Sequence, residues 1–337
     1  MTAVDALSEE MGVLPRDIVA PKGQVAHGLL RDRTAFVGLV VVSSLAVAAL
    51  LAPFLAPHDP NVVDVVRRFA PPSAEFPLGT DHLGRDVLSR LLYGARLSIG
   101  ATLVVTFGIS VIGVVMGMLA GYLVGLVDTV ISRVIEILLA LPPFLLALAV
   151  TGVLGPGLGN LTLAMTAVWW ASYARIVRGV VIAERSRLYV EAARAIGSSD
   201  ARIVSRHVLP NIVAPVVVLT TLDLGAVLLG LSGLSFLGLG VKPPTAEWGA
   251  MLAEARVYLA PAPNMMLFPG AAIFLMVLGF NLLGDGLRDV LDPRTRRYVP
   301  HRVRRSITSL RARRSADSSS ETPGTSSVSD PIGASRP

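Results

Sequence analysis

Long stretches without a charged residue are the feature that most limits how this chain can fold. They extend over residues 34–57, 97–127 and 137–174, and further apolar runs follow in the second half of the chain. Because a helix needs about 20 apolar residues to cross the hydrocarbon core of a bilayer, each stretch is long enough to span a membrane. With 53% hydrophobic and 16% charged residues, the chain is also too apolar for an ordinary soluble domain. The sequence therefore predicts an all-α membrane protein.

The stretch at 137–174 is too long for one crossing, and a glycine-rich run at 152–160 divides it into two. In total we expect six transmembrane helices, at about residues 34–57, 98–123, 131–153, 160–180, 210–236 and 264–286. They form one membrane domain over residues 31–296. A segment at 1–30 precedes it. A tail at 297–337, rich in arginine and then in serine and threonine, is expected to be disordered.

Arginine is distributed unevenly between the predicted loops. Residues 175–206 contain seven arginines against three acidic residues, and nine arginines without an acid lie between Arg294 and Arg314. Lysine and arginine are enriched in the cytoplasmic loops of membrane proteins. We therefore place residues 175–206 and both termini in the cytoplasm, which agrees with an even number of spans. The basic tail is expected to contact membrane lipid, because anionic headgroups attract arginine near the surface.

A polar segment lies between the fourth and fifth predicted spans. Its apolar residues recur at helical spacing from 184 to 196. Gly197 then stands where a helix would stop, since glycine enters the left-handed conformation at no steric cost. A following serine can cap a second helix with Asp200 in its first turn, and Pro210 is expected to end that helix. The result is a helix, a turn and a helix with small alanines on its surface, which predicts a docking element rather than a catalytic one.

The order of residues in this segment resembles the cytoplasmic coupling loop of ABC importer permeases. The matching positions are Glu191, Ala192, Ala193, Gly197, Leu209 and Pro210. In that family the loop inserts into a groove on an ATPase subunit and passes the ATP-driven movement to the membrane helices. His207 departs from the pattern, because many members have isoleucine there. The resemblance implies that these residues dock an ATPase in this chain.

Two further motifs are similar to one class of these permeases. They are Gly79-Thr80-Asp81 with Leu83-Gly84-Arg85-Asp86 and Tyr93-Gly94-Ala95-Arg96, and Leu234 to Gly240 with Pro243-Pro244 and Trp248-Gly249. Both resemble the dipeptide, oligopeptide and nickel class, in particular the permease usually second of the pair. The resemblance implies a type I ABC importer permease fold in the bacterial plasma (inner) membrane. It also implies partners: a homologous second permease, one or two ABC ATPase subunits and an extracytoplasmic substrate-binding protein.

Signs of catalysis are absent from the sequence. It contains no Gly-x-x-x-x-Gly-Lys-Ser/Thr phosphate loop, so we expect ATP to be bound and hydrolysed only by partner subunits. It has no cysteine and five scattered histidines, so we predict no catalytic residue, no metal and no cofactor on this chain. A passive channel is an alternative that leaves the coupling loop unexplained. A membrane-tethered DNA-binding regulator is a remote one, based on the helix-turn-helix pattern, and we expect no nucleic-acid partner.

Asp223 is an ionisable residue inside the fifth predicted span. An aspartate facing lipid at the centre of a helix costs about 2.5 to 3.5 kcal/mol on insertion scales, so we expect Asp223 to face the bundle or a water-filled path. Two roles stay open: a place in the translocation pathway, and a polar contact with a neighbouring helix. The substrate cannot be read from the sequence, and peptides, nickel complexes and other small solutes all fit the class.

Overall fold

The computed structural model describes residues 30–291 of the 337-residue chain. Within this range the structure is helical, and its only bridge between extended segments joins Thr80 and Asp86. The predicted segments at 1–30 and 297–337 lie outside the described residues, apart from Leu30. The helices are α3 (Arg33–Leu50), α4 (Ala52–Leu55), α5 (Val87–Tyr122), α6 (Leu126–Leu139), α7 (Pro143–Leu154), α8 (Leu158–Arg185), α9 (Leu188–Ala195), α10 (Asp200–Ile203), α11 (Leu209–Phe236), α12 (Trp248–Ala255) and α13 (Asn264–Leu291).

Four of the described helices are long and apolar enough to cross a membrane: α3, α5, α13 and α11 together with α10. A fifth crossing results if α6 and α7 count as one bent span. The predicted fourth span corresponds to α8, which is 28 residues long. Its hydropathy is lowered by Trp169 and Trp170 and by Arg175 and Arg178. Within residues 30–291 the structure thus confirms the all-α architecture, with four or five apolar spans, and the count of six stays a prediction.

The third predicted span, at 131–153, is broken into two helices. Helices α6 and α7 meet at an angle of 85°. Pro142 has an extended backbone (φ −54°, ψ 126°), and Pro143 begins α7. A residue before proline is driven out of the helical region, and neither proline has an N–H to donate to the preceding turn. Two consecutive prolines therefore end one helix and start the next in a new direction.

Helix α5 is longer than the predicted second span. The span was predicted to begin at about residue 98, whereas one helix of 36 residues begins at Val87 and continues through the apolar run. At 1.5 Å per residue it is about 54 Å long, more than the roughly 30 Å of hydrocarbon, so it extends beyond the membrane. Its glycines allow α8 to come close: a Cβ atom on Gly117 would lie 2.7 Å from the Ala174 carbonyl oxygen. Small residues serve the same purpose at many transmembrane helix contacts.

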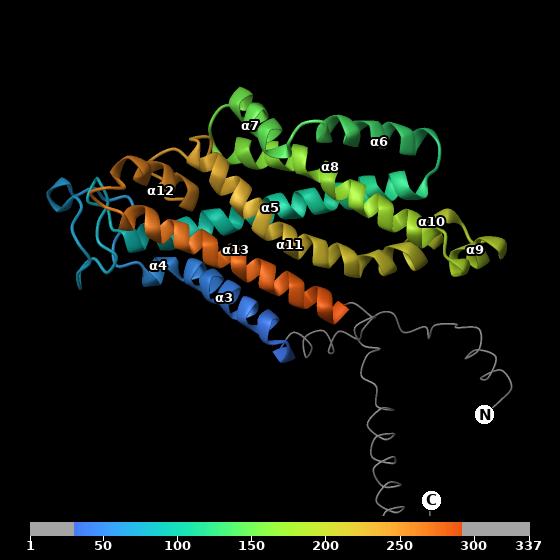
Figure 1. Cartoon of the computed structure of the whole chain (residues 1–337), viewed down its shortest axis with the longest axis horizontal. Helices are drawn as coiled ribbons and strands as arrows, with labels where there is room; N and C mark the ends of the chain where they lie inside the picture. Colours follow the sequence, from blue (N-terminus) through green and yellow to red (C-terminus); the bar gives the residue numbers. More distant parts are fainter. Residues whose placement is uncertain (1–29, 292–337) are drawn as a thin grey trace, which may run out of the picture. The chain divides into compact units, whose positions relative to one another are not determined.

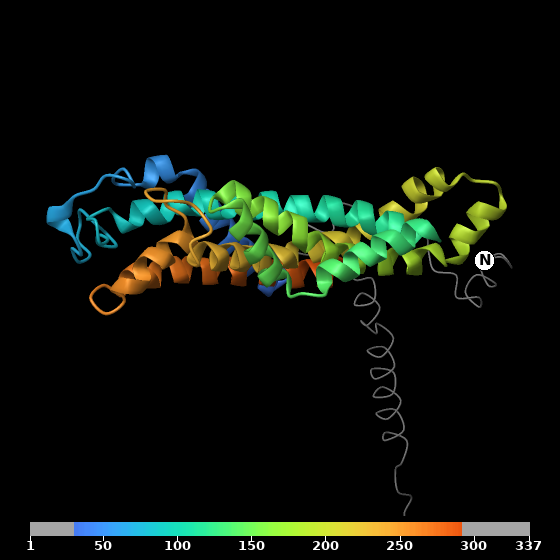
Figure 2. The same ribbon diagram turned by 90° about the horizontal axis from the view of Figure 1, so that it is seen from above.

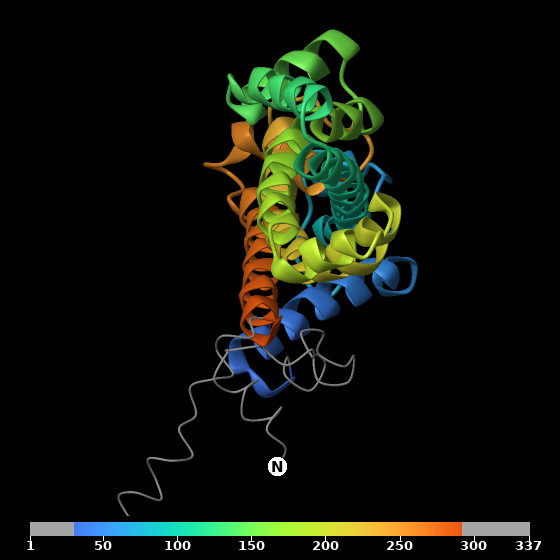
Figure 3. The ribbon, with the colours of Figure 1, turned by 90° about the vertical axis from the view of Figure 1, so that its right-hand side faces the viewer.

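Figures 1 and 2 show the long helices α5, α8, α11 and α13 running lengthwise beside one another, with contacts between α5 and α8, α5 and α11, and α11 and α13. Helix α3 packs against α13, and Figure 3 shows this pair from the end. Helices α9 and α10 lie at one end of the bundle, which we call the α9 end. Helix α12 and the segment 56–86 lie at the opposite end, which we call the α12 end.

Candidate functional site

The predicted helix at 184–196 is two helices in the structure. Helix α8 ends at Arg185, and α9 begins at Leu188 after Arg187, whose backbone is extended (φ −76°, ψ 142°). The change of direction lets Val190 and Ala193 of α9 pack into a buried apolar cluster at the α9 end. A continuous helix would carry α9 along the axis of α8, away from that cluster. Burial of the apolar face explains the break, because neither glycine nor proline is present there.

Gly197 ends α9 in the predicted way. Its φ is +82°, and the amides of Gly197 and Ser198 donate to the carbonyls of Arg194 and Ala193 at 3.0 and 3.1 Å. This pair of bonds is the Schellman motif, which a residue in the left-handed conformation closes. Ser199 then occupies the N-cap of α10, although its side chain makes no capping bond. The prediction of a turn at Gly197 is confirmed.

Pro210 does not end the second helix, contrary to the prediction. Helix α10 continues through a π-helical turn (Val204–Val208) directly into α11, and Pro210 lies in the first turn of α11. Proline cannot donate to the carbonyl four residues earlier, and the wider π-helical turn before it, closed by the Leu209 amide on the Val204 carbonyl, accommodates that missing bond. We use the name coupling unit for α9, the turn at Gly197 and α10. It is continuous with α11.

The outer face of α9 is exposed and partly apolar. Leu188 and Ile196 are 83% and 82% exposed, and Glu191 and Ala192 between them are also exposed. A Cβ atom on Gly197 would meet no other atom within 4 Å, so the turn borders open space. Contiguous apolar residues on a surface are typical of protein contact sites. We call this face, from Leu188 to Gly197, the docking surface.

The remaining predicted coupling residues have different surroundings. Ala193 is buried in the apolar cluster, so it holds α9 against the bundle and is not available to a partner. Leu209 and Pro210 are exposed at the start of α11. His207, the departure from the family pattern, packs its ring 6.0 Å from the ring of Tyr189. An aromatic contact therefore occupies the position where many members have isoleucine.

Tyr189 connects α9 to both α8 and α11. The Tyr189 hydroxyl donates to Glu184 at the end of α8 and accepts a bond of 2.8 Å from Asn211 at the start of α11. Burial, together with the bond to the Glu184 carboxylate, raises the pKa of Tyr189 to about 12. The phenol is therefore neutral at physiological pH and remains a donor. This contact fixes the orientation of α9 against the bundle.

Asp223 lies half-buried in α11, beside a group of hydroxyls. Thr220, one turn earlier, contacts Tyr173 of α8 and lies 3.3 Å from the Ser110 hydroxyl of α5. Tyr173 also donates to the Val216 carbonyl at 3.0 Å. Among the described residues, none forms a hydrogen bond or ion pair with the Asp223 carboxylate. The predicted alternative of a paired structural aspartate therefore has no contact to support it.

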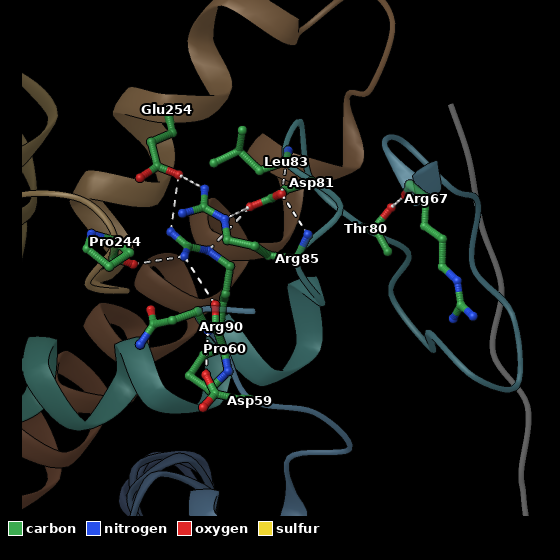
Figure 4. A network of polar contacts seen from close by, with 11 residues as sticks. Asp59, Pro60, Arg67, Thr80, Asp81, Leu83, Arg85, Arg90, Pro244 and Glu254 are labelled. Carbon is green, nitrogen blue, oxygen red and sulfur yellow. Dashed lines mark hydrogen bonds and ion pairs between the residues drawn. The ribbon is translucent and has the colours of Figure 1, made fainter. Parts of the chain in front are cut away.

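A second polar site at the α12 end was missed by sequence reasoning. Figure 4 shows Arg85 and Arg90, each 1% exposed, between the carboxylates of Asp81 and Glu254. Arg85 binds Asp81 at 2.6 Å and Glu254 at 2.5 Å. Arg90 lies 3.1 Å from Glu254 and 3.5 Å from Asp81, and donates to the Pro244 carbonyl at 3.1 Å. We call these four charged residues the ionic network.

The sequence indicated only the local part of this network. Asp81 and Arg85 are four residues apart in a motif that was recognised, whereas Glu254 is 169 residues away from Arg85 in the chain. The ligand atoms of Asp81, His82 and Glu254 lie within 4.8 Å of one another, as a metal site would require. Two guanidinium groups, however, already bind these carboxylates and repel a cation. The arrangement fits an internal ion pair rather than a metal site.

Comparison with known proteins gives two family matches. Residues 113–297 match the family described as binding-protein-dependent transport system inner membrane component. Residues 22–72 match the N-terminal TM domain of oligopeptide transport permease C. Both matched regions include described helices, and the first includes the whole coupling unit.

Curated relatives cover most of the chain. It is 41% identical over 276 residues to the dipeptide transport system permease protein DppC of Alkalihalophilus pseudofirmus, covering 82% of this chain and 91% of that protein. It is 42% identical over 255 residues to the nickel transport system permease protein NikC of Escherichia coli, covering 76% and 92%. The dipeptide permease DppC of Haemophilus influenzae is 40% identical over 270 residues, covering 78% and 92%.

Proposed function

This chain belongs to the family of binding-protein-dependent transport system inner membrane components, and we propose that it forms half of the translocation pathway of an ATP-driven importer. Its relatives are permeases named for dipeptide and nickel transport, so the chain is the membrane component of an ABC importer. We propose peptides or related small solutes as its cargo. Asp223, with no partner inside the described bundle, is our candidate for a residue that faces the pathway.

The docking surface is the single observation that carries the coupling role. Exposed apolar side chains at Leu188 and Ile196 flank Glu191 at one end of the bundle, on a helix held rigidly by Tyr189 and the Gly197 turn. An ATPase subunit with a matching groove would bury this surface. That subunit would bind and hydrolyse ATP. This chain would supply no catalytic group. The other proposed partners are a homologous second permease and an extracytoplasmic binding protein.

The proposed topology has six crossings, with α8 and the bent pair α6 and α7 as two of them. Both termini and the coupling unit are then cytoplasmic in a bacterial plasma membrane. Seven arginines against three acids at 175–206 support this orientation. The α9 end and the α12 end lie at opposite ends of the bundle, as sites on opposite sides of a membrane must.

Neither alternative gains support. A passive channel would not need a surface that docks an ATPase. A DNA-binding helix-turn-helix needs a core of its own, whereas the buried residues of the coupling unit pack with α8 and α11.

Two substitutions on the docking surface test the proposal. Gly197→Val places a β-branched residue at φ +82° and adds bulk in open space. Glu191→Lys sets a third positive charge beside Arg187 and Arg194. We expect both variants to insert into the membrane but to retain less ATPase in a pull-down. Substrate-stimulated ATP hydrolysis in reconstituted vesicles should fall with it.

Gly238→Val is the matched control, because Gly238 closes the same kind of Schellman turn with φ +90° and open space around it, but lies at the other end of α11 from the coupling unit. It places a β-branched residue in the same kind of turn without touching the docking surface. Normal ATPase retention and full stimulated hydrolysis in both docking-surface variants would refute the proposed function.

A further inference from the structure

The chain connects the coupling unit to only two of the long helices. Helix α9 follows α8, and α10 continues into α11. Helix α5, which packs along both α8 and α11, has no chain connection to the coupling unit. A displacement of the coupling unit therefore reaches the end of α5 only through side-chain contacts.

One side chain at the end of α5 makes hydrogen bonds of this kind. Tyr122 is the last residue of α5, and its hydroxyl donates to Oδ1 of Asp200, the first residue of α10, at 2.6 Å. Nη2 of Arg194 on α9 donates to the same hydroxyl at 3.5 Å and lies 3.9 Å from Asp200 Oδ1. A single phenol oxygen thus joins the end of α5 to both helices of the coupling unit.

The geometry around Tyr122 fixes the direction of its hydroxyl. The ring is buried in the apolar cluster at the α9 end, together with Val181, Val190 and Ile203. The Arg185 guanidinium lies over the ring, 5.9 Å from its centre. The Asp200 side chain, by contrast, is 68% exposed, and its contacts with Tyr122 and Arg194 hold it toward the bundle. A buried donor at the end of α5 and an acceptor at the start of α10 thus form a direct link between the two helices.

We propose that the hydrogen bond between Tyr122 and Asp200 transmits the movement of the coupling unit to α5. Tyr122 and Asp200 are positioning residues: neither lies on the docking surface, and neither touches ATP or cargo. The inference rests on the proposed function, because it presupposes an ATPase that moves the coupling unit. It adds a specific route by which that movement reaches α5, which the chain does not join directly to the coupling unit.

The test is the amount of substrate imported per ATP hydrolysed by the complete reconstituted complex. Tyr122→Phe keeps the ring and its packing but removes the hydroxyl, and Asp200→Ala removes the exposed acceptor. We expect both variants to insert and to keep the ATPase bound and hydrolysing. Import per ATP should fall about fivefold or more, the lower range of coupling between distant sites. The double variant should be no worse than either single variant, because all three lack the same bond.

Asp200→Asn is the conservative variant, since its carbonyl oxygen accepts the same bond. It should restore import per ATP to nearly the unaltered value. Tyr258→Phe at the α12 end is the control for loss of a tyrosine hydroxyl, and we expect no change. An unaltered ratio in Tyr122→Phe, loss of the ATPase from it, or an Asp200→Asn variant as impaired as Asp200→Ala would each overturn the inference alone. An unaltered complex that binds no ATPase would overturn the proposed function, and the inference with it.

Discussion

His82 shows how a single side chain responds to its surroundings at the α12 end. Its ring stacks on Tyr258 with centroids 4.9 Å apart. Burial is the main cause that lowers the pKa of His82. The two acids of the ionic network act to raise this pKa and the two arginines act to lower it, so their effects oppose one another. The folded protein therefore favours the neutral imidazole.

This shift predicts a pH dependence of stability. Below the ordinary histidine pKa of 6.5 the unfolded chain binds a proton that the folded chain resists, so the stabilisation from neutral His82 is present above that pH and is lost as pH falls below it. His82→Phe keeps the stack on Tyr258 and removes the titrating group. We expect the unfolding temperature in detergent to drop less in this variant than in the unaltered protein, between about pH 7.5 and pH 5.5. Equal drops in the two proteins would show that His82 does not contribute to the pH dependence of stability.

At the scale of elements, α12 is anchored to α5 by two sets of buried polar contacts. The ionic network joins the segment before α5, the start of α5 and the end of α12. The buried Glu247 carboxylate caps α12 through the amides of Gly249 and Ala250 and accepts a bond from Ser98 of α5 at 2.9 Å. The Trp248 indole donates to the Leu91 carbonyl at 3.0 Å. Helix α12 is therefore a fixed part of the bundle.

Removing one acid from the ionic network is expected to loosen this anchor. Glu254→Ala leaves Arg85 and Arg90 buried with a single carboxylate between them, and breaking a buried ion pair in this way costs about 3 to 5 kcal/mol. Glu75→Ala is the matched control, because Glu75 pairs with Arg67 on the surface, where a salt bridge contributes about 1 kcal/mol or less. Denaturant unfolding should show a clearly larger loss for Glu254→Ala. Equal losses would mean that the network does not hold α12.

Local signals explain which elements were predictable. Gly197 ends α9 as expected, because the left-handed turn depends only on the residue at that position. The break at Ser186 and Arg187 was not predictable, since it follows from the burial of Val190 in a cluster formed by distant helices. The continuity of α10 with α11 was missed for a similar reason. A proline normally marks a boundary, but here a π-helical turn accommodates it.

At the scale of the whole molecule, the length of the apolar runs predicted the membrane helices, because each run contains few or no charged residues. It succeeded for α3, α11 and α13 and underestimated α5, whose polar first turns hide a continuous helix. The ionic network could not be predicted, because Glu254 is 169 residues away from Arg85 in the chain. The coupling residues were recognised from their order, but their surroundings were not: Ala193 is buried, while Leu188 and Ile196 form the exposed face.

The central claim is that the α9 end docks an ATPase, and site-specific photocrosslinking in membranes tests it most directly. A photoreactive residue replaces Ile196, 82% exposed on the docking surface, or Leu259, 52% exposed at the α12 end. Both side chains are large, apolar and exposed, so either replacement leaves the core intact. The account predicts a crosslink from position 196 to the ATPase subunit and none from position 259. An ATPase crosslink from position 259, or none from position 196 in a complex that still imports substrate, would contradict it.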